Sequence, residues 1–559
     1  MVRATFSGFN TALSALQANQ KRLDITGQNL SNMNTAGYTR QQLEASSLNY
    51  TNPVSHYSNG NETAVGFGVS MDRVSQIRDP YLDIQYRSQS ADCSYTNRLQ
   101  TALNSLSKVL DETTISGIRQ AFDDIQSTLT SMQDPAKVSD PIYESELRTK
   151  MQSVCNLFNQ ASRQITQAEQ NEFQRLTGEG SSEQGDVQKI NDILRQIGDL
   201  NVQIKRNQVA GHPSLELQDE RNLLLDELSG YIPVETRYYK DDAHSGNNAY
   251  DYDANGAVIG KKDWPDDLEV SMNYIDAQGK SQKLILVNGS DLGADGLTKN
   301  YGQLSMLKGD HQTAASVSDP ANISIKFEKA PSYQGNGPAA TNDVYAELKG
   351  IRFEGGSLQA SLDMLQKTGT GKVINGSTAV DDVRGYQYYS EKLDHLALTF
   401  AESMNNINNG NKNPKDQNLL SNSTDDSTTG ITAGNIGISK GWTSGTVHIS
   451  TNGTNRTDTI LDMIAAMKDT KKLNGKTFAD YMNNLSTQLA SDSSSNQTAL
   501  KTGTTVLNSI QDSRDSLSGV SLDEEATNMM AYVSAYNAAS RLMTALDEVL
   551  NTLISNTGA

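Results

Sequence analysis

The chain of 559 residues contains only two cysteines, Cys93 and Cys155. This scarcity excludes a disulfide framework and a cysteine-rich zinc site. Both cysteines fall in segments whose patterns predict separate long helices, and a free cysteine in such a setting is most often buried. We therefore expect two helix-packed thiols. A single Cys93–Cys155 bridge is the alternative if the two helices lie antiparallel.

Long apolar runs and positive charge are also lacking. Hydrophobic residues make up 36% of the chain, and no stretch approaches the ~18 consecutive apolar residues that a membrane span needs. The opening residues, Met1 to Phe6, lack the apolar segment and cleavage site of a secretory signal. The formal net charge is −19, and no basic stripe offsets it, which disfavours phosphate backbones and anionic membranes. We expect neither nucleic acid nor membrane as a partner.

Motifs that would carry catalysis are incomplete. The six histidines are scattered without a metal-binding spacing, and no serine stands in a G-x-S-x-G elbow. Lys476 and Thr477 follow Gly475 as at the end of a phosphate loop, but Thr470 stands where that loop requires glycine. The sequence therefore predicts no enzyme, no catalytic residue and no cofactor.

One fragment is similar to the start of a calcium loop. Asp251, Asp253 and Asn255 alternate before Gly256, and oxygen ligands at such positions suit Ca²⁺. Position twelve of the loop is Lys262 rather than a bidentate glutamate, and no helix pattern precedes the fragment. We predict no metal site, and calcium binding by these three residues stays open.

The chain alternates between helical and strand-rich textures. Helical patterns cover the first thirty residues, Asp79 to about Glu112, 141–178, 183–209, 357–366, 380–408 and most of 458–554. Short alternating runs punctuated by Gly, Asp and Asn cover 31–75 and 232–353. The pattern predicts an elongated multidomain α+β protein with terminal coiled-coil helices, a helix-rich inner domain and a β-rich inserted outer domain. The expected units are 1–40 with 515–559, 41–231 with 354–410 and 458–514, 232–353, and a small loop and strand insertion at 411–457.

The strongest repeats lie at the two ends of the chain. Each is an unbroken 3-4 spacing of coiled-coil type, ~37 Å long at ~1.5 Å per residue. We expect these helices to pair with each other or with copies from neighbouring chains, as an assembly seam that orders on polymerisation. An ordinary intramolecular hairpin is the alternative. The apolar seam positions are Phe6, Phe9, Leu13, Leu16, Leu23, Leu30, Met529, Tyr532, Tyr536, Ala539, Met543, Leu546, Leu550 and Leu553.

Two motifs flank these helices. The turn after the first helix contains Asn29, Asn32, Thr35, Gly37, Tyr38 and Arg40. Because Asn and Gly tolerate left-handed backbone, Asn32, Asn34 and Gly37 can end a helix and reverse the chain. The second motif, S-G-V-S-L-D-E-E-A, precedes the last helix and includes Ser518, Gly519, Val520, Leu522, Asp523, Glu524 and Glu525.

The first motif resembles the signature shared by bacterial flagellar rod, hook and hook-associated proteins. The second resembles the S-G-V-N-L-D-E-E-A of the family of flagellar hook-associated protein 1, the first hook–filament junction protein. Segments 217–229, 355–363 and 393–408 are similar to helices of the same family. The resemblance covers about 1–230, 355–410 and 500–559, whereas 232–353 and 411–457 match no motif.

The resemblance implies a structural axial protein of the extracellular flagellum, exported by the flagellar type III system without a cleaved signal. It would form a short ring of its own copies at the distal end of the hook. It would contact hook protein on one side and a second hook–filament junction protein on the other. A cytosolic export chaperone would hold the C-terminal helix, and the β-rich insertion would face outward.

Two other functions remain open at this point. A hook or distal-rod structural protein would share the first motif, although the second motif and the long helical region favour the junction protein. An exported wall hydrolase with axial-type ends would need a paired-carboxylate cleft within 232–457. The β-rich insertion could also bind a host surface.

Overall fold

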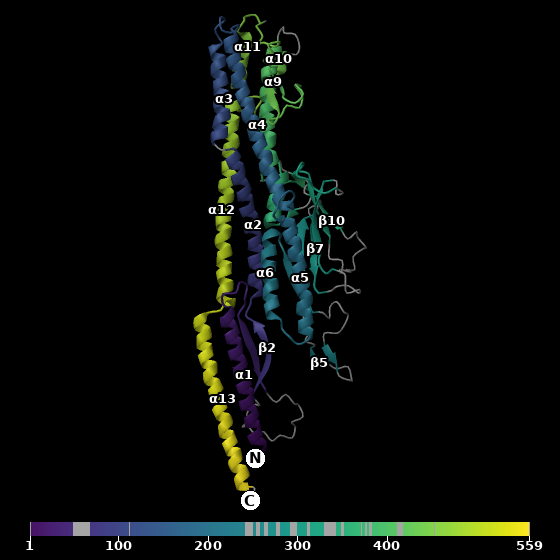
Figure 1. Ribbon diagram of the computed structural model, residues 1–559, viewed down its shortest axis with the longest axis vertical. Helices are drawn as coiled ribbons and strands as arrows, with labels where there is room; N and C mark the ends of the chain where they lie inside the picture. Colours follow the sequence, from purple (N-terminus) through teal and green to yellow (C-terminus); the bar gives the residue numbers. More distant parts are fainter. Residues whose placement is uncertain are drawn as a thin grey trace.

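The computed structural model describes residues 2–48, 68–110, 112–240, 250–252, 258–261, 266–275, 280–290, 299–309, 313–328, 343–347, 352–369, 372–374, 377–379, 383–410, 417–451 and 453–557. The molecule is long and narrow, with helices running lengthwise and small antiparallel sheets on one flank (Figure 1). This is the elongated α+β arrangement with long terminal helices that the sequence predicts.

The long helices begin where the sequence provides an N-terminal cap. Asp79 and Asp140 each accept a hydrogen bond from the backbone two residues on, and proline occupies the first turn of both helices. The helices are α1 (Val2–Asn32), α2 (Pro80–Val109), α3 (Glu112–Ser131), α4 (Pro141–Thr177), α5 (Asp186–Val209), α6 (Leu215–Tyr231), α8 (Gly356–Gln366), α9 (Tyr386–Asn409), α10 (Lys440–Ser444), α11 (Asp458–Lys468), α12 (Phe478–Ser518) and α13 (Leu522–Thr557).

The strands form short antiparallel sheets. β6 pairs with β3, β7 and β11, while β9 lies between β8 and β10, and the rest form two-stranded ribbons. The strands are β1 (Gln41–Ser47), β2 (Val69–Gln76), β3 (Glu235–Lys240), β4 (Tyr250–Tyr252), β5 (Val258–Lys261), β6 (Asp266–Ile275), β7 (Ser281–Asn288), β8 (Gln303–Lys308), β9 (Ile323–Glu328), β10 (Asp343–Glu347), β11 (Arg352–Phe353), β12 (Lys372–Ile374), β13 (Ser377–Ala379), β14 (Leu420–Asn422) and β15 (Ile436–Ile438).

Most of the expected helices and the strand-rich stretch are present, with two differences. No helix is expected at 112–131, but α3 lies there. The helix expected from 380 begins at Tyr386, after the ribbon of β12 and β13. The division of the chain into four units stays a prediction.

The terminal helices α1 and α13 lie side by side and antiparallel at one end of the molecule, and both chain termini are found there (Figure 1). α2 and α12 continue from this pair, and α3, α4, α9 and α11 gather at the opposite end. There, Phe400 and Phe478 each pack against Phe122, with ring centroids 5.2 and 5.6 Å from it.

The sheets are attached to α5 through two side-chain amides, of which that of Asn201 is buried and that of Asn191 is half-buried. On α5, Asn191 exchanges two hydrogen bonds with the backbone of Leu304, and Asn201 donates to the carbonyls of Leu268 and Gly289. The apolar core continues from the helices into the sheet residues without a break. The β-rich stretch is therefore fixed along the flank formed by α5 and α6.

Both cysteines are free and buried, as expected, so the alternative of a Cys93–Cys155 bridge is wrong. Cys155 lies in the core, where burial raises the pKa of its thiol to about 12. Cys93 faces α12, with its Sγ 3.6 Å from the hydroxyl of Thr504. Because of its high pKa, the Cys155 thiol is unreactive near neutral pH.

At Gly356 the start of α8 packs so closely against the end of α6 that no side chain fits between the two backbones. The φ of Gly356 is +85°, and a β-carbon there would lie 2.3 Å from the carbonyl oxygen of Tyr231. Gly211 has nearly the same φ, +86°, but a β-carbon there would meet nothing within 4 Å. We expect Gly211→Ala to lower the free energy of unfolding by ~1 kcal/mol, the cost of left-handed backbone alone.

Gly356→Ala should cost at least ~2 kcal/mol more, because the backbone around Tyr231 must also move. Urea unfolding followed by circular dichroism measures both variants. Equal losses would show that the close approach at Tyr231 is absent.

Candidate functional site: the junction of the two terminal motifs

The turn after α1 is held by the side chain of Asn29. This residue is 1% exposed. Its Oδ1 accepts hydrogen bonds from the backbone N of Gln41 at 3.0 Å and from the hydroxyl of Tyr38 at 2.9 Å. Its Nδ2 donates to the carbonyl of Gln41 at 3.0 Å. The amide therefore replaces a strand neighbour and fixes where the returning chain crosses the end of α1.

The turn itself uses Gly37 and Asn32 in different ways. Gly37 has a φ of +78°, and its α-carbon faces Leu223 of α6. Asn32 accepts the backbone N–H of Thr35 with its carbonyl, and its side chain accepts the Thr35 hydroxyl. The helix ends at Asn32, as expected, and left-handed backbone is found at Gly37 but not at Asn32 or Asn34, which keep negative φ.

Arg40 joins this turn to the motif that precedes α13. Its backbone N donates to the carbonyl of Ser518 at 2.9 Å. Its Nε donates to Glu525 and one Nη to Glu524, both at 2.7 Å. The Glu525 side chain is 3% exposed, whereas that of Glu524 is 62% exposed. The pair with Glu525 therefore lies in a medium of low dielectric, where removing one partner would leave a buried unpaired charge at a high cost in stability. The pair with Glu524 is exposed to solvent and contributes little to stability.

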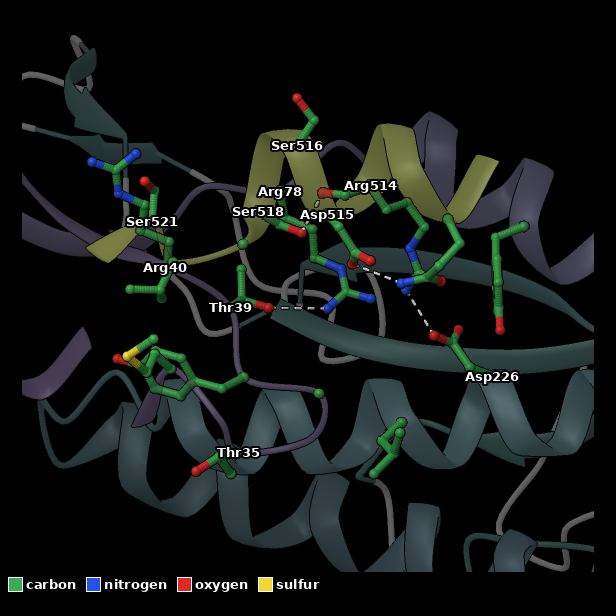
Figure 2. A pocket seen from close by; sticks show the side chains of 18 of the residues that line it. Thr35, Thr39, Arg40, Arg78, Asp226, Arg514, Asp515, Ser516, Ser518 and Ser521 are labelled. Atoms are coloured by element: carbon green, nitrogen blue, oxygen red, sulfur yellow. Dashed lines mark hydrogen bonds and ion pairs between the residues drawn. The ribbon is translucent and has the colours of Figure 1, made fainter. Parts of the chain in front are cut away.

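A second set of ion pairs lies next to Arg40 and fixes the end of α12. Arg514 donates to Asp226 of α6 at 2.7 Å and lies 3.1 Å from Asp83 of α2. Its guanidinium stands 4.2 Å from the centroid of the Tyr86 ring, a cation–π contact. Arg78 pairs with the same Asp83. Figure 2 shows Arg514 reaching Asp226, and Arg78 reaching Thr39.

Sequence reasoning found both motifs but missed these partners. Arg78 and Asp83 lie five residues apart at the start of α2, but Asp226 and Arg514 come from two distant places in the chain, and no spacing rule connects the three. Segment 217–229 was recognised only as similar to a family helix, yet it supplies Asp226 to the site. We call the turn 29–40, the segment 518–525 and these four residues the terminal junction.

Asp219 is a buried carboxylate at the edge of the terminal junction. It is 5% exposed, and its Oδ2 accepts the backbone N–H of Thr39 at 3.0 Å. Its Oδ1 accepts no hydrogen bond from the described residues and lies 3.9 Å from the Arg78 guanidinium. Burial raises the pKa of Asp219 to about 6, although the hydrogen bonds from Thr39 and the charge of Arg78 oppose the rise.

A cleft of about 700 Å³ opens beside the terminal junction. Residues of both motifs line it, from Thr35 and Arg40 to Ser518 and Ser521, and Figure 2 shows Arg40 and Ser521 next to each other. Met33 on its rim is 39% exposed. The cleft is thus lined both by apolar side chains and by the ion-paired residues of the terminal junction.

The seam residues of α1 lie beside its most buried face. Among the described side chains, the apolar residues that α1 buries are Ala12, Ala18 and Ile25, whereas Leu13 is 44% exposed. Phe9, Leu16, Leu23 and Leu30 are half-buried, and the side chain of Phe6 lies outside the description. Much of the leucine repeat is therefore uncovered in the single chain.

α13 shows the same incomplete burial. Leu546 packs over Gly8, where a β-carbon would lie 3.5 Å from it, and Arg22 lies over the Tyr532 ring. Ala539 is buried, and Leu553 is 39% exposed. The half-buried seam positions are Met529, Tyr532, Tyr536, Met543, Leu546 and Leu550.

The described residues include no group of three or more His, Cys, Asp or Glu placed to hold a metal ion. Asp253 and Asn255 of the calcium-like fragment lie outside the described residues, and the side chain of Asp251 is not described either. Within the described part of the chain, no helix has the length and apolar character of a membrane span.

Family models and individual proteins show similarity to this chain. The model for the flagellar hook-associated protein FlgK helical domain matches residues 103–417. The models for the flagella basal body rod protein and the flagellar basal body rod FlgEFG protein C-terminal region match 9–39 and 513–556. The two rod matches thus fall on the two motifs that meet at the terminal junction.

The chain is 29% identical to flagellar hook-associated protein 1 of Bacillus subtilis over 99% of both chains. It is 29% identical to that of Salmonella typhimurium over 40% of this chain and 38% of that protein. A solved structure, the flagellar hook junction protein FlgK from Burkholderia pseudomallei, aligns with a TM-score of 0.39 and 19% identity, over 61% of this chain and 46% of that chain.

The raised pKa of Asp219 predicts a specific pH dependence of stability. Because the folded state holds this proton more tightly than the unfolded chain, stability falls as pH rises from the ordinary pKa of the carboxyl, 3.8, to about 6. Asp219→Asn keeps an oxygen for Thr39 and cannot ionise. At pH 7 it should exceed the parent in free energy of unfolding by up to ~3 kcal/mol, at ~1.4 kcal/mol per pKa unit.

The difference between Asp219→Asn and the parent should shrink as pH falls and disappear below about pH 3, where the parent carboxyl is protonated in both states. Urea unfolding at a series of pH values measures it. Glu220→Gln, on the exposed neighbouring side chain, controls for the loss of one negative charge. A difference that stays constant from pH 4 to 7 contradicts the prediction.

Proposed function

This chain belongs to the family of flagellar hook-associated protein FlgK, a family of structural proteins of the flagellum, and we propose that it forms a short ring at the distal end of the hook. In this position it joins the hook to the filament through a second junction protein. Hook protein would contact one side of the ring and the second junction protein the other.

The terminal junction is the observation that carries this proposal. It locks the turn after α1 onto the segment before α13 through Arg40, Ser518 and Glu525. The α1–α13 pair therefore projects from the helical bundle as one module with a fixed base (Figure 1). A module held in this way can place its exposed seam against neighbouring subunits.

The uncovered seam gives self-assembly its driving force. Leu13, Leu16 and Leu23 keep part of their apolar surface in water in the single chain. Covering the exposed half of each leucine in a ring contributes on the order of 1 kcal/mol per side chain. The seam positions on both helices would then form the inner layer of the ring, which is the assembly role proposed for them.

Other features fit an exported axial subunit. Two free thiols in a long chain leave little scope for cross-linking during export through the flagellar type III system. The sheets that contain β6, β7 and β8 lie along α5 on the flank of the helical bundle (Figure 1), so they would face outward. An export chaperone would cover the C-terminal helix α13 before assembly.

The helical-domain match distinguishes this proposal from the hook or distal-rod alternative, because the rod models match only the two ends of the chain. A wall hydrolase has no specific observation in its favour. The proposed function therefore stays structural.

Deleting the gene tests the position in the flagellum. We expect bare hooks in electron micrographs and flagellin released into the medium, because filament subunits would lack their attachment site. Missing hooks would indicate a rod or hook subunit instead. Intact filaments would sink the proposal.

Leu13→Asp tests the seam without disturbing the single chain. Because Leu13 is 44% exposed, the free energy of unfolding of the purified protein should change by less than ~0.5 kcal/mol. The variant should nevertheless be missing from isolated hooks, since a charge would be buried between subunits. Immunoblots of hooks from the complemented deletion strain measure incorporation.

Two further variants control this experiment. Gln17→Asp adds the same charge at an exposed position outside the repeat and should incorporate normally. Leu546→Asp, at the contact with Gly8, should also block incorporation while the helical bundle stays folded. Normal amounts of Leu13→Asp on hooks would contradict the seam assignment.

A further inference from the structure

α12 is anchored in the core only over its first part. Phe478, Met482, Leu485 and Leu489 are buried against the bundle. Beyond Leu489, all of which the structure describes, the helix buries a single side chain, that of Asn496. By contrast, α5 buries ten of its 24 residues. The C-terminal part of α12, residues 490–518, therefore lies on α2 with little apolar burial, and we call it the strap.

Polar side chains form the centre of the contact between the strap and α2. Asn496 donates to the carbonyl of Thr96 and to the side chain of Gln100, both at 2.9 Å. Gln100 in turn donates to the hydroxyl of Ser493 at 2.8 Å. These groups lie where a coiled coil normally places apolar residues. A polar residue at such a position fixes the register of two helices and lowers their stability.

The next turns of the strap are also held weakly. Cys93 faces Thr504 at 3.6 Å, and a β-carbon on Gly503 would lie 3.3 Å from the same sulfur. The apolar residues of this part of the strap, Leu500, Leu507 and Ile510, are only half-buried. Water can replace most of these polar contacts when the helices separate, since polar groups lose little on transfer from a wet interface to solvent.

Ion pairs hold the strap at both of its ends: near its start, Arg384 donates to Asp492 at 2.5 and 2.8 Å, and Arg514 lies near its far end. Arg514 makes two ion pairs, to Asp83 and Asp226, and stacks on Tyr86. The Arg514 side chain is 13% exposed, so these pairs are partly shielded from solvent. The strap is thus anchored by the core at one end, latched by Arg514 at the other, and weakly attached between.

We propose that the strap opens from α2 as a unit while the rest of the helical bundle stays folded. Opening breaks the Arg514 latch and the polar contacts of Asn496 but exposes little apolar surface, so it needs less free energy than global unfolding. Once separated from α2, the strap is an isolated helix, which is only marginally stable in water, so its backbone hydrogen bonds open transiently and expose its amides. Its opening would free the segment that carries α13 from the helical bundle.

Hydrogen exchange of the full-length monomer tests this directly. Amides in 497–513 should exchange at least ~100-fold faster than those of 190–204 in α5, because local opening exposes them without global unfolding. Equal exchange rates in the two segments would overturn the proposal, since the strap would then open only when the bundle unfolds.

A disulfide provides the matched control. Thr504→Cys places a second thiol beside Cys93, and the present contact of 3.6 Å is close enough for a bond after a small side-chain rotation. Oxidation should slow exchange in 497–513 by at least ~10-fold without changing 190–204, and reduction should reverse the effect. Thr505→Cys, at the exposed neighbouring position, should form no such bond and show no slowing.

Arg514→Ala provides the opposite change. Loss of the latch should speed exchange in 497–513 further and leave 190–204 unchanged. If the oxidised Thr504→Cys chain gives no added protection, exchange in 497–513 does not depend on separation of the strap from α2, and the proposal fails. Slowing in both segments would also contradict it, because the disulfide would then be stabilising the whole fold.

Discussion

The tie between Arg40 and the segment 518–525 is the contact on which the architecture depends. It joins residues 485 positions apart, so every other element is inserted between the two halves of one terminal module. Closing so long a loop costs entropy that grows only slowly with length, and several short contacts together can offset it. The backbone bond to Ser518 and the buried pair with Glu525 do this alongside Asn29, which shapes the turn. Insertions in the flanking sheets therefore leave the terminal module unchanged.

Electrostatics at the terminal junction follows from burial. Arg40, Arg78 and Arg514 are all less than one-fifth exposed, and each faces a carboxylate. Unpaired charges in such surroundings would be strongly unfavourable. Sharing Asp83 between Arg78 and Arg514 couples α2 to the end of α12. Asp219 is the exception, because one of its oxygens lacks a hydrogen bond from the described residues, and its raised pKa records the cost.

Local signals in the sequence predicted much of this fold and part of the site. Asp-Pro caps located α2 and α4, and the two motifs located both halves of the terminal junction. The signal for α3 was also present, in the spacing of Ile118, Phe122 and Ile125, but was overlooked. The partners Asp83 and Asp226 could not be predicted, because tertiary packing alone brings them to Arg514. Likewise, the leucine repeat of α1 could be predicted from its spacing. The spacing does not indicate that the face with Ala12, Ala18 and Ile25, rather than the leucine face, is the more buried one in the single chain.

The anchoring of α12 at one end gives the molecule a lever. At ~1.5 Å per residue, the strap extends ~43 Å beyond the core. A tilt of about 5° at its base would displace its far end by roughly 4 Å, more than the length of a hydrogen bond. A small tilt of the strap at its base, which hardly changes the packing of the core, is therefore enough to make or break the contacts of Arg514. Force applied along α13 would first break the ion pairs of Arg514 with Asp83 and Asp226, before it exposes apolar residues of the helical bundle.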